Sequence, residues 1–285
     1  MTLFSGGDIK AASMHTTWTH LHAFVQNIVA ALPLEVVVAL IVTGTLSILG
    51  WLSRQSYKHW RRIRFAKVFG RDLSRYSFVF GTLVVRQDLL VLAEKIATSL
   101  ARFPLSKPGR IDVAFSAQTL TSGCEIRAVA YLFSLLRRIG RISVDVVSDE
   151  TITSKLDLNF VAFGATSNLK TVDTFANPGN DLADYNKEIA CFVSKKDGSS
   201  LHPKPESRDY GIILKIHPSQ FPERTWICCA GIGEWGTSGA AWFLANRWKE
   251  IAKDIRKDES FVCVVEVTPQ QDESARRLSL NVRAV

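Results

Sequence analysis

Residues 225–267 read TWICCAGIGEWGTSGAAWFLANRWKEIAKDIRKDESFVCVVEV. They contain an apolar run, TWICCA, then a glycine-rich loop, then the helical pattern AAWFLANRWKEIAKDI, and finally a second apolar run, FVCVVEV. Short apolar runs rich in β-branched and aromatic residues indicate strands, and apolar residues at helical spacing indicate a helix. This order of strand, loop, helix and strand is the repeating unit of an α/β domain.

The chain before this unit shows the same alternation of apolar runs and helical patterns. We expect strands at 77–85, 111–115, 142–147 and 156–164, helices at 88–101 and 123–138, and an antiparallel hairpin formed by 188–193 and 210–216. The mostly apolar run at 156–164 is a candidate for the centre of the sheet. The sequence therefore predicts the α/β class over residues 76–285, with a Rossmann-like, mostly parallel sheet and an antiparallel hairpin.

A second feature is the uncharged run at residues 36–52, VVVALIVTGTLSILGWL. At about 1.5 Å of rise per residue, a helix of this length, extended slightly at its start, is able to cross a hydrocarbon core of about 30 Å. We therefore predict a transmembrane helix at 34–53, preceded by an amphipathic segment at 1–33. The alternatives are a buried helix of a soluble core and a cleaved signal peptide, whose basic residues would precede the apolar run.

The basic residues of this region follow the apolar run instead. Within a predicted juxtamembrane linker at 54–75, the stretch 54–71 carries seven of them: Arg54, Lys58, Arg61, Arg62, Arg64, Lys67 and Arg71. Cytoplasmic flanks of membrane helices are rich in Lys and Arg, so we expect a single-pass protein of the inner membrane with its large domain in the cytoplasm. Much of the net charge of +8 is in this stretch. We attribute it to topology and to contact with membrane lipid, and expect no specific nucleic-acid partner, with RNA phosphates as the alternative.

The sequence offers few candidates for metal binding or catalysis. The five cysteines lie in the predicted soluble part without CxxC spacing and are Cys124, Cys191, Cys228, Cys229 and Cys263. Reduced thiols fit a cytoplasmic domain. Structural zinc sites use paired ligands at short, fixed spacing, so we expect no metal site. The sequence has no Ser/His/Asp, Cys/His or paired-carboxylate constellation with diagnostic spacing, so we expect no catalytic residues.

The glycine-rich loop after TWICCA is the sharpest candidate for a binding site, because it follows a strand and opens a helix. Glycines let the backbone approach a ligand closely, and the unpaired N–H groups of a helix N-terminus bind anions such as phosphate. The ligand-binding candidates here are Gly231, Gly233, Gly236, Thr237 and Ser238. Glu234 would repel a phosphate unless it pairs with a ribose hydroxyl, so we assign it to ligand recognition. The alternative is a tight turn that binds no ligand.

A second loop, which follows the run at 156–164, is rich in small hydroxyl and amide groups. Its candidates are Gly164, Thr166, Ser167 and Asn168. In open α/β sheets, ligands bind beyond the carboxyl ends of the strands, and both loops are expected there. We therefore expect the two loops to face each other across the sheet edge. The alternative is an ordinary Ser/Asn turn.

The N-terminal anchor, the strand-ending GATSN at 164–168 and the late GIGEWGTSGAAWFLA at 231–245 together resemble the membrane-linked branch of the SLOG superfamily, most closely its STALD type. The likeness extends from about residue 77 to the end of the chain. It implies a sensor of a nucleotide-derived second messenger in bacterial antiphage defence. LOG enzymes of that superfamily carry PGGxGTxxE, and here only the glycines and Gly236-Thr237 correspond, with Ala240 in the place of the glutamate. This departure argues against carrying over their phosphoribohydrolase activity.

We therefore expect a membrane-anchored sensor and effector. It would bind a nucleotide or a nucleotide-derived second messenger, form homo-oligomers and disrupt the inner membrane. No further cofactor is expected. Two alternatives are a membrane-tethered enzyme that processes nucleotides or nucleosides, and a scaffold that recruits a protein partner to the membrane.

Overall fold

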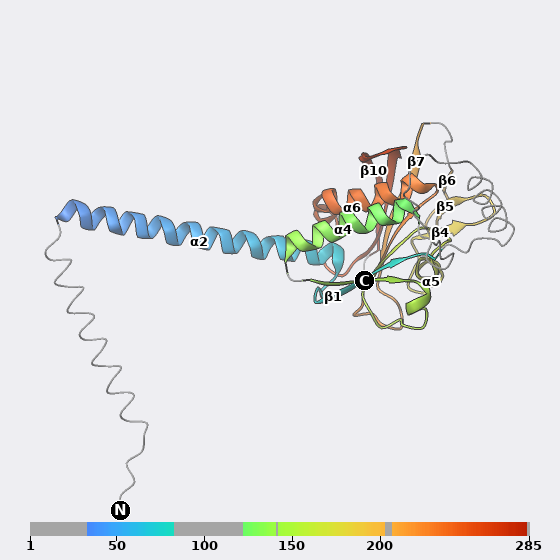
Figure 1. Ribbon diagram of the computed structural model, residues 1–285, viewed down its shortest axis with the longest axis horizontal. Coiled ribbons are helices and arrows are strands. Elements are labelled where there is room, and N and C mark those ends of the chain that lie inside the picture. Colours follow the sequence, from blue (N-terminus) through green and yellow to red (C-terminus); the bar gives the residue numbers. More distant parts are fainter. Residues whose placement is uncertain (1–32, 83–121, 141, 203–206, 284–285) are drawn as a thin grey trace, which may run out of the picture. The chain divides into compact units, whose positions relative to one another are not determined.

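Figure 1 shows the computed structural model, which describes residues 33–82, 122–140, 142–202 and 207–283. The chain divides into two units, Met1–Trp60 and Arg61–Val285. Apart from Pro33, the predicted amphipathic segment at 1–33 lies outside the described residues, as do the predicted helix at 88–101 and the predicted strand at 111–115.

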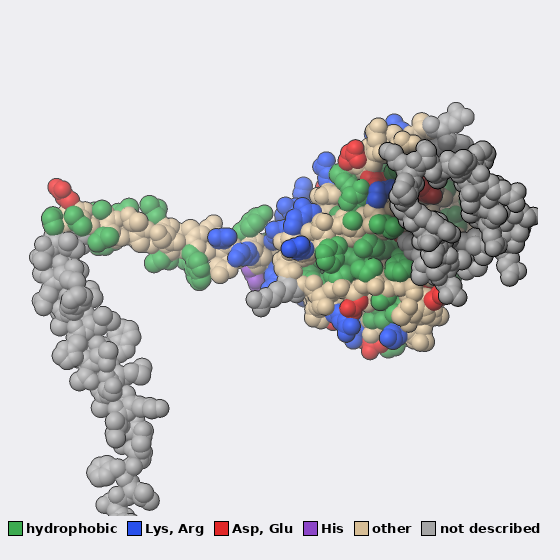
Figure 2. All heavy atoms as spheres, in the orientation of Figure 1, with side chains coloured by type: hydrophobic (Ala, Val, Ile, Leu, Met, Phe, Trp, Pro, Cys, Tyr) green, Lys and Arg blue, Asp and Glu red, His purple; other side chains and the backbone are tan. Residues whose placement is uncertain are grey.

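Helix α2, Leu34–Phe69, carries the predicted membrane segment. It has 36 residues and is long and apolar enough to cross a membrane. None of its apolar window is buried, which counts against a core helix. The hydroxyls of Thr45 and Ser47 donate to carbonyls four residues earlier, so the helix itself satisfies these polar groups, as a lipid environment requires. Figure 2 shows hydrophobic side chains along this helix, with Lys and Arg side chains beyond them.

Residues 54–69, the first part of the predicted juxtamembrane linker, continue the same helix without a break. The helix ends at Gly70, whose φ of +85° is a left-handed conformation that glycine adopts at low cost. The Gly70 N–H donates to the Ala66 carbonyl at 2.8 Å and closes the last turn. A side chain at Gly70 would also overlap Thr225.

The second unit is built on a seven-stranded sheet of order β10-β9-β7-β8-β3-β1-β2. Its strands are β1 Arg75–Phe80, β2 Ser143–Ser148, β3 Phe160–Phe163, β7 Asp209–Ile216, β8 Trp226–Gly231, β9 Ser260–Thr268 and β10 Gln271–Arg283. The neighbours β2, β1, β3 and β8 are parallel, whereas β7 and β10 run against their neighbours. Five of the seven strands therefore point the same way, which confirms the predicted mixed α/β class and mostly parallel sheet. β3 has all four residues buried and lies inside the sheet, as predicted for its run.

Helices α4, Gly123–Ile139, and α6, Glu234–Asp254, run side by side over one face of the sheet (Figure 1). Alternate strand residues face them, and Phe78, Val161 and Ile213 belong to the core on this side. Val79, Phe160 and Ile212 point to the opposite face, where a second core forms. This alternation follows from the two-residue period of a strand.

The second face carries helix α5, Leu169–Ala176, the 3-10 turn η2, Glu150–Ile152, and a small antiparallel sheet. The small sheet has the order β4-β5-β6, with β4 at Ala183–Asn186, β5 at Cys191–Ser194 and β6 at Ser200–Leu201. The predicted hairpin between 188–193 and 210–216 is therefore wrong, because β5 pairs with β4 and β6. A tight turn through Gly198, with φ of +69°, returns the chain to β6, and the almost fully buried β7 pairs with β8 and β9 instead.

The last turns of α2 are part of the core of the second unit. Phe65 stacks on Phe69 with ring centroids 4.3 Å apart and meets Trp248 of α6 edge-on at 5.3 Å. The Lys67 Nζ donates to the carbonyls of Ala252 and Ile255, at 3.3 and 2.9 Å, and so caps the C-terminal end of α6.

Lys215 of β7 is fully buried and donates to the Lys67 carbonyl at 2.8 Å. Burial lowers the pKa of its amine to about 8. The end of α2 is thus bonded to both α6 and β7.

Candidate functional site

The candidate site is a cavity of about 310 Å³ at the carboxyl ends of β3 and β8. This volume is at the small end of the range for ligand pockets, roughly 300–1,000 Å³. The structure brings both predicted loops to it, and the predicted residues that line it are Gly164, Thr166, Ser167, Gly231, Gly233, Glu234 and Thr237. Three other predicted residues, Asn168, Gly236 and Ser238, are not part of the lining. The expectation that the loops face each other is confirmed in geometry.

Asn168 is held inside the protein by its own hydrogen bonds. Its side-chain amide donates to the carbonyls of Val79 and Phe163, at 2.8 and 3.0 Å, and its oxygen accepts the N–H groups of Lys170 and Thr171 at the start of α5. The residue is fully buried. All the bonding capacity of this amide is therefore used to join the ends of β1 and β3 to α5.

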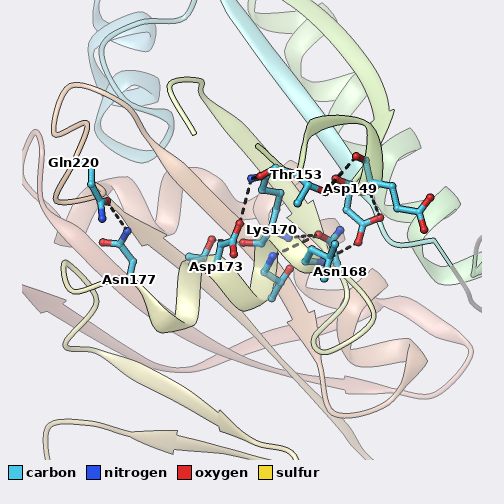
Figure 3. A network of polar contacts seen from close by, with 11 residues as sticks. Asp149, Thr153, Asn168, Lys170, Asp173, Asn177 and Gln220 are labelled. Carbon is cyan, nitrogen blue, oxygen red and sulfur yellow. Dashed lines mark hydrogen bonds and ion pairs between the residues drawn. The ribbon is translucent and has the colours of Figure 1, made fainter. Parts of the chain in front are cut away.

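Asp149, directly after β2, also bonds to the start of α5 and to the segment after β1. Its carboxylate accepts the N–H groups of Thr82, Glu150 and Leu169, at 3.2, 2.9 and 2.8 Å. Figure 3 shows Asp149 and Asn168 in one polar network with Lys170, whose Nζ donates to the Thr153 carbonyl at 2.7 Å. This network fixes the loop after β3, whose residues line the cavity.

The predicted glycine-rich loop is largely the first turn of α6, which begins at Glu234 rather than at residue 240. A side chain at Gly236 would overlap the Tyr210 carbonyl, and one at Gly231 would overlap the Thr237 amide. Gly231 and Gly236 therefore let α6 start in close contact with β7 and β8. This packing role explains these glycines without a ligand.

Asp209, the first residue of β7, occupies the helix N-terminus. Its carboxylate accepts the N–H of Gly233 at 3.0 Å and the N–H of Gly236 at 2.7 Å. These are two of the donors that a phosphate at the start of α6 would use. The chain thus supplies its own anion at the position where the sequence predicted a phosphate.

Ser238 belongs to a separate buried network between α4, α6 and β10. It donates to Asp272 at 2.6 Å, and Asp272 also accepts from Arg127 and Tyr131, at 3.1 and 2.9 Å. The Arg127 guanidinium lies 4.3 Å from the Trp235 ring centroid. Arg127 is therefore held by a carboxylate and an aromatic ring.

Glu125, in the first turn of α4, lines the cavity and was not among the predicted residues. It is 2% exposed, and it accepts the Gly81 N–H at 2.8 Å and the Ser167 hydroxyl at 3.4 Å. Burial, together with a smaller contribution from the nearby Asp149, raises the pKa of Glu125 to about 7 against the opposing effect of these two hydrogen bonds. A buried carboxyl that titrates near neutrality beside a cavity is a feature of functional sites.

The local sequence gives a misleading signal for Glu125. Ser122 and Glu125 have the S-x-x-E spacing of a capping box, in which the two side chains cap one helix end. In the structure Ser122 makes no side-chain cap bond, and Glu125 reaches across to Gly81 at the end of β1. The contact between Glu125 and Gly81 depends on the fold and is not visible in the local sequence.

The other lining groups limit the possible chemistry. Among the described lining residues the charged side chains are Glu125 and Glu234, and none is Lys or Arg. Cys124 also lines the cavity, and burial raises the pKa of its thiol, which disfavours the nucleophilic thiolate. Within the described parts of the chain, no group of three or more His, Cys, Asp or Glu residues could hold a metal ion. All five cysteines are free and buried.

A larger hollow of about 780 Å³ lies along β2, which is an edge strand among the described residues. Four of its charged groups form two pairs at the surface: Arg75 with Asp145 at 2.7 Å and Arg224 with Asp157 at 2.6 Å. We therefore assign the site to the smaller cavity, where a buried carboxyl and two loops converge. No protein-family model, curated protein or solved structure matches this chain, so the chemistry of the cavity rests on its own residues.

Proposed function

We propose that this chain is a single-pass sensor of the inner membrane whose cytoplasmic α/β domain binds a nucleotide-derived small molecule in the cavity between the two loops. The observation that carries the proposal is the meeting of the loops after β3 and β8 around one cavity at the carboxyl edge of the parallel strands. Ligands of open α/β sheets bind at this edge. The hydroxyls of Thr166, Ser167 and Thr237 at this cavity suit the polar groups of such a ligand.

The membrane part of the proposal rests on α2. Its apolar window is exposed, and seven basic residues follow it at 54–71 against Lys10 before it, which favours a retained anchor over a signal peptide. The proposed response is a change of oligomeric state that disrupts the membrane. Such a response requires the ligand to bind one state of the domain more tightly than the other.

The binding proposal can be tested on the full chain in lipid nanodiscs by calorimetric titration with nucleosides, nucleotides and cyclic dinucleotides. Thr166 is exposed at the cavity, so Thr166→Trp should obstruct the cavity without disturbing the core. Thr151→Trp, at an exposed position outside the cavity, is the matched control. Binding that survives Thr166→Trp unchanged would refute the assignment of the ligand to this cavity.

A second candidate function is favoured by Glu125. A carboxyl with a pKa of about 7 is able to donate and accept a proton at neutral pH, which suits general acid–base catalysis on a bound nucleoside or nucleotide. Chromatography of the same compounds after incubation with the protein measures this directly. If the protein converts one of these compounds, and Glu125→Gln abolishes the conversion while binding persists, the protein is an enzyme. If all compounds stay intact, the sensor function is the one supported.

A further inference from the structure

The start of α6 is already occupied by an internal anion. The Asp209 carboxylate bridges the N–H groups of Gly233 and Gly236, and the backbone of β7 fixes it there. A phosphate that used the same donors would have to displace this carboxylate. The phosphate would then also lie close to the negative charge of the displaced carboxylate. The positive partial charge at the N-terminus of α6 therefore stabilises the Asp209 carboxylate.

The walls of the cavity also oppose a phosphate. Glu125 comes from α4 and Glu234 from α6, and Asp149 lies close enough to Glu125 to raise the pKa of its carboxyl. Among the described residues, the nearby cation Arg127 is engaged by Asp272 and the Trp235 ring. Because charges of like sign repel, and do so most strongly beside the buried Glu125, a phosphate between the loops would be bound weakly.

The same groups favour a ligand that donates hydrogen bonds. An ionised carboxylate has about four acceptor positions, and Glu125 uses two of them, one in a long bond of 3.4 Å to Ser167. Glu234 is exposed at the cavity. Sugar hydroxyls and base N–H groups are donors of the kind that these carboxylates accept.

We infer, on the basis of the proposed function, that the cavity holds the nucleoside part of the ligand and that Glu125 and Glu234 exclude phosphate from the space between the two loops. A phosphorylated ligand must place its phosphates outside this space. The glycine-rich start of α6 is accordingly a packing element beside the nucleoside.

The inference includes a dependence on pH. A donor on the ligand bonds best to ionised Glu125, so binding draws a proton off this residue. With a pKa of about 7 for Glu125, the affinity should rise between about pH 6 and pH 8. A ligand that instead accepts a hydrogen bond from the protonated carboxyl would bind more weakly as the pH rises.

The test compares the ribonucleosides with their 5′-monophosphates as ligands of the full chain in nanodiscs. We expect one nucleoside to bind at least about tenfold more tightly than its monophosphate, a difference of about 1.4 kcal/mol. Glu125→Gln and Glu234→Gln should each reduce this preference. The exposed Glu150, outside the cavity, gives the control Glu150→Gln, which should leave the preference unchanged.

Three results would overturn the inference. A monophosphate that binds as tightly as its nucleoside would show that the cavity accepts phosphate, while the proposed function would stand. A nucleoside preference unchanged by Glu234→Gln, whose exposed position carries little risk of misfolding, would remove the role of the carboxylates. Failure of every nucleoside, nucleotide and cyclic dinucleotide to bind would overturn the proposed function together with this inference.

Discussion

Replacement of Glu125 by glutamine should stabilise the domain at neutral pH, although it alters the candidate site. Glutamine has the same shape, and its oxygen is able to accept the Gly81 N–H that now bonds to the carboxylate. Its amide is able to donate to the Ser167 hydroxyl. The substitution therefore removes a buried charge while both hydrogen-bond contacts persist.

The magnitude follows from the pKa of Glu125, which burial raises from an ordinary 4.5 to about 7. At about 1.4 kcal/mol per pKa unit, this interval corresponds to about 3 kcal/mol. Because the folded state holds the proton more tightly than the unfolded state, the contribution to stability is complete below pH 4.5 and is lost as the pH rises through about 7. The free energy of unfolding of Glu125→Gln should equal that of the natural protein near pH 4.5 and exceed it by up to about 3 kcal/mol above pH 7.

The measurement is urea denaturation of both proteins in detergent, followed by circular dichroism across this pH range. Glu150→Gln removes a carboxylate from an exposed position outside the cavity and should show no such dependence. A difference between Glu125→Gln and the natural protein that stays constant with pH would refute the buried, raised-pKa carboxyl. So would a variant that is less stable than the natural protein at pH 7.5.

Three further substitutions address the packing and the junction with α2. Phe65→Ala removes a fully buried ring and should cost about 3–5 kcal/mol of stability, seen as a lower melting temperature; an unchanged melting temperature would contradict the packing of α2. Lys215 has a pKa of about 8, below its ordinary 10.5, so the natural protein should gain stability relative to Lys215→Met from about pH 8 to pH 10. Urea titrations of both proteins measure this, and the absence of a relative gain would exclude a buried amine with a lowered pKa. Gly236→Ala should destabilise the domain by about 1–3 kcal/mol because the added carbon overlaps the Tyr210 carbonyl, and natural melting behaviour would show that α6 and β7 can separate.

The periodicity of the sequence was sufficient to predict the α/β class and the buried position of β3 inside the sheet, one strand away from its centre. It was not sufficient to predict strand partners. The run at 210–216 is apolar throughout, and such a run shows that a strand is buried without showing which strands flank it. The hairpin prediction failed for this reason. The backbone hydrogen bonds of β7 are made with β8 and β9 in the main sheet.

The candidate site, too, could be predicted from the sequence only in part. The rule that ligand loops follow parallel strands correctly brought Gly164 and Gly231 to one cavity. It could not indicate Asp209, because the carboxylate comes from the start of another strand and bonds to glycines more than twenty residues away. Nor could it indicate Glu125, whose partner Gly81 is 44 residues earlier. Both residues change the charge of the site, so the prediction of a phosphate ligand was made without the groups that oppose it.

The elements that form the cavity are also the elements that hold α2. Helix α6 begins with Glu234 at the cavity and ends at carbonyls that the Lys67 amine caps. Strand β7 begins with Asp209 at the same helix N-terminus and, near its other end, donates from Lys215 to the Lys67 carbonyl. A ligand that moves the start of α6 relative to β7 would therefore act on both contacts of Lys67. Such coupling requires two arrangements of these elements with different affinities for the ligand, since a ligand that binds both equally shifts neither.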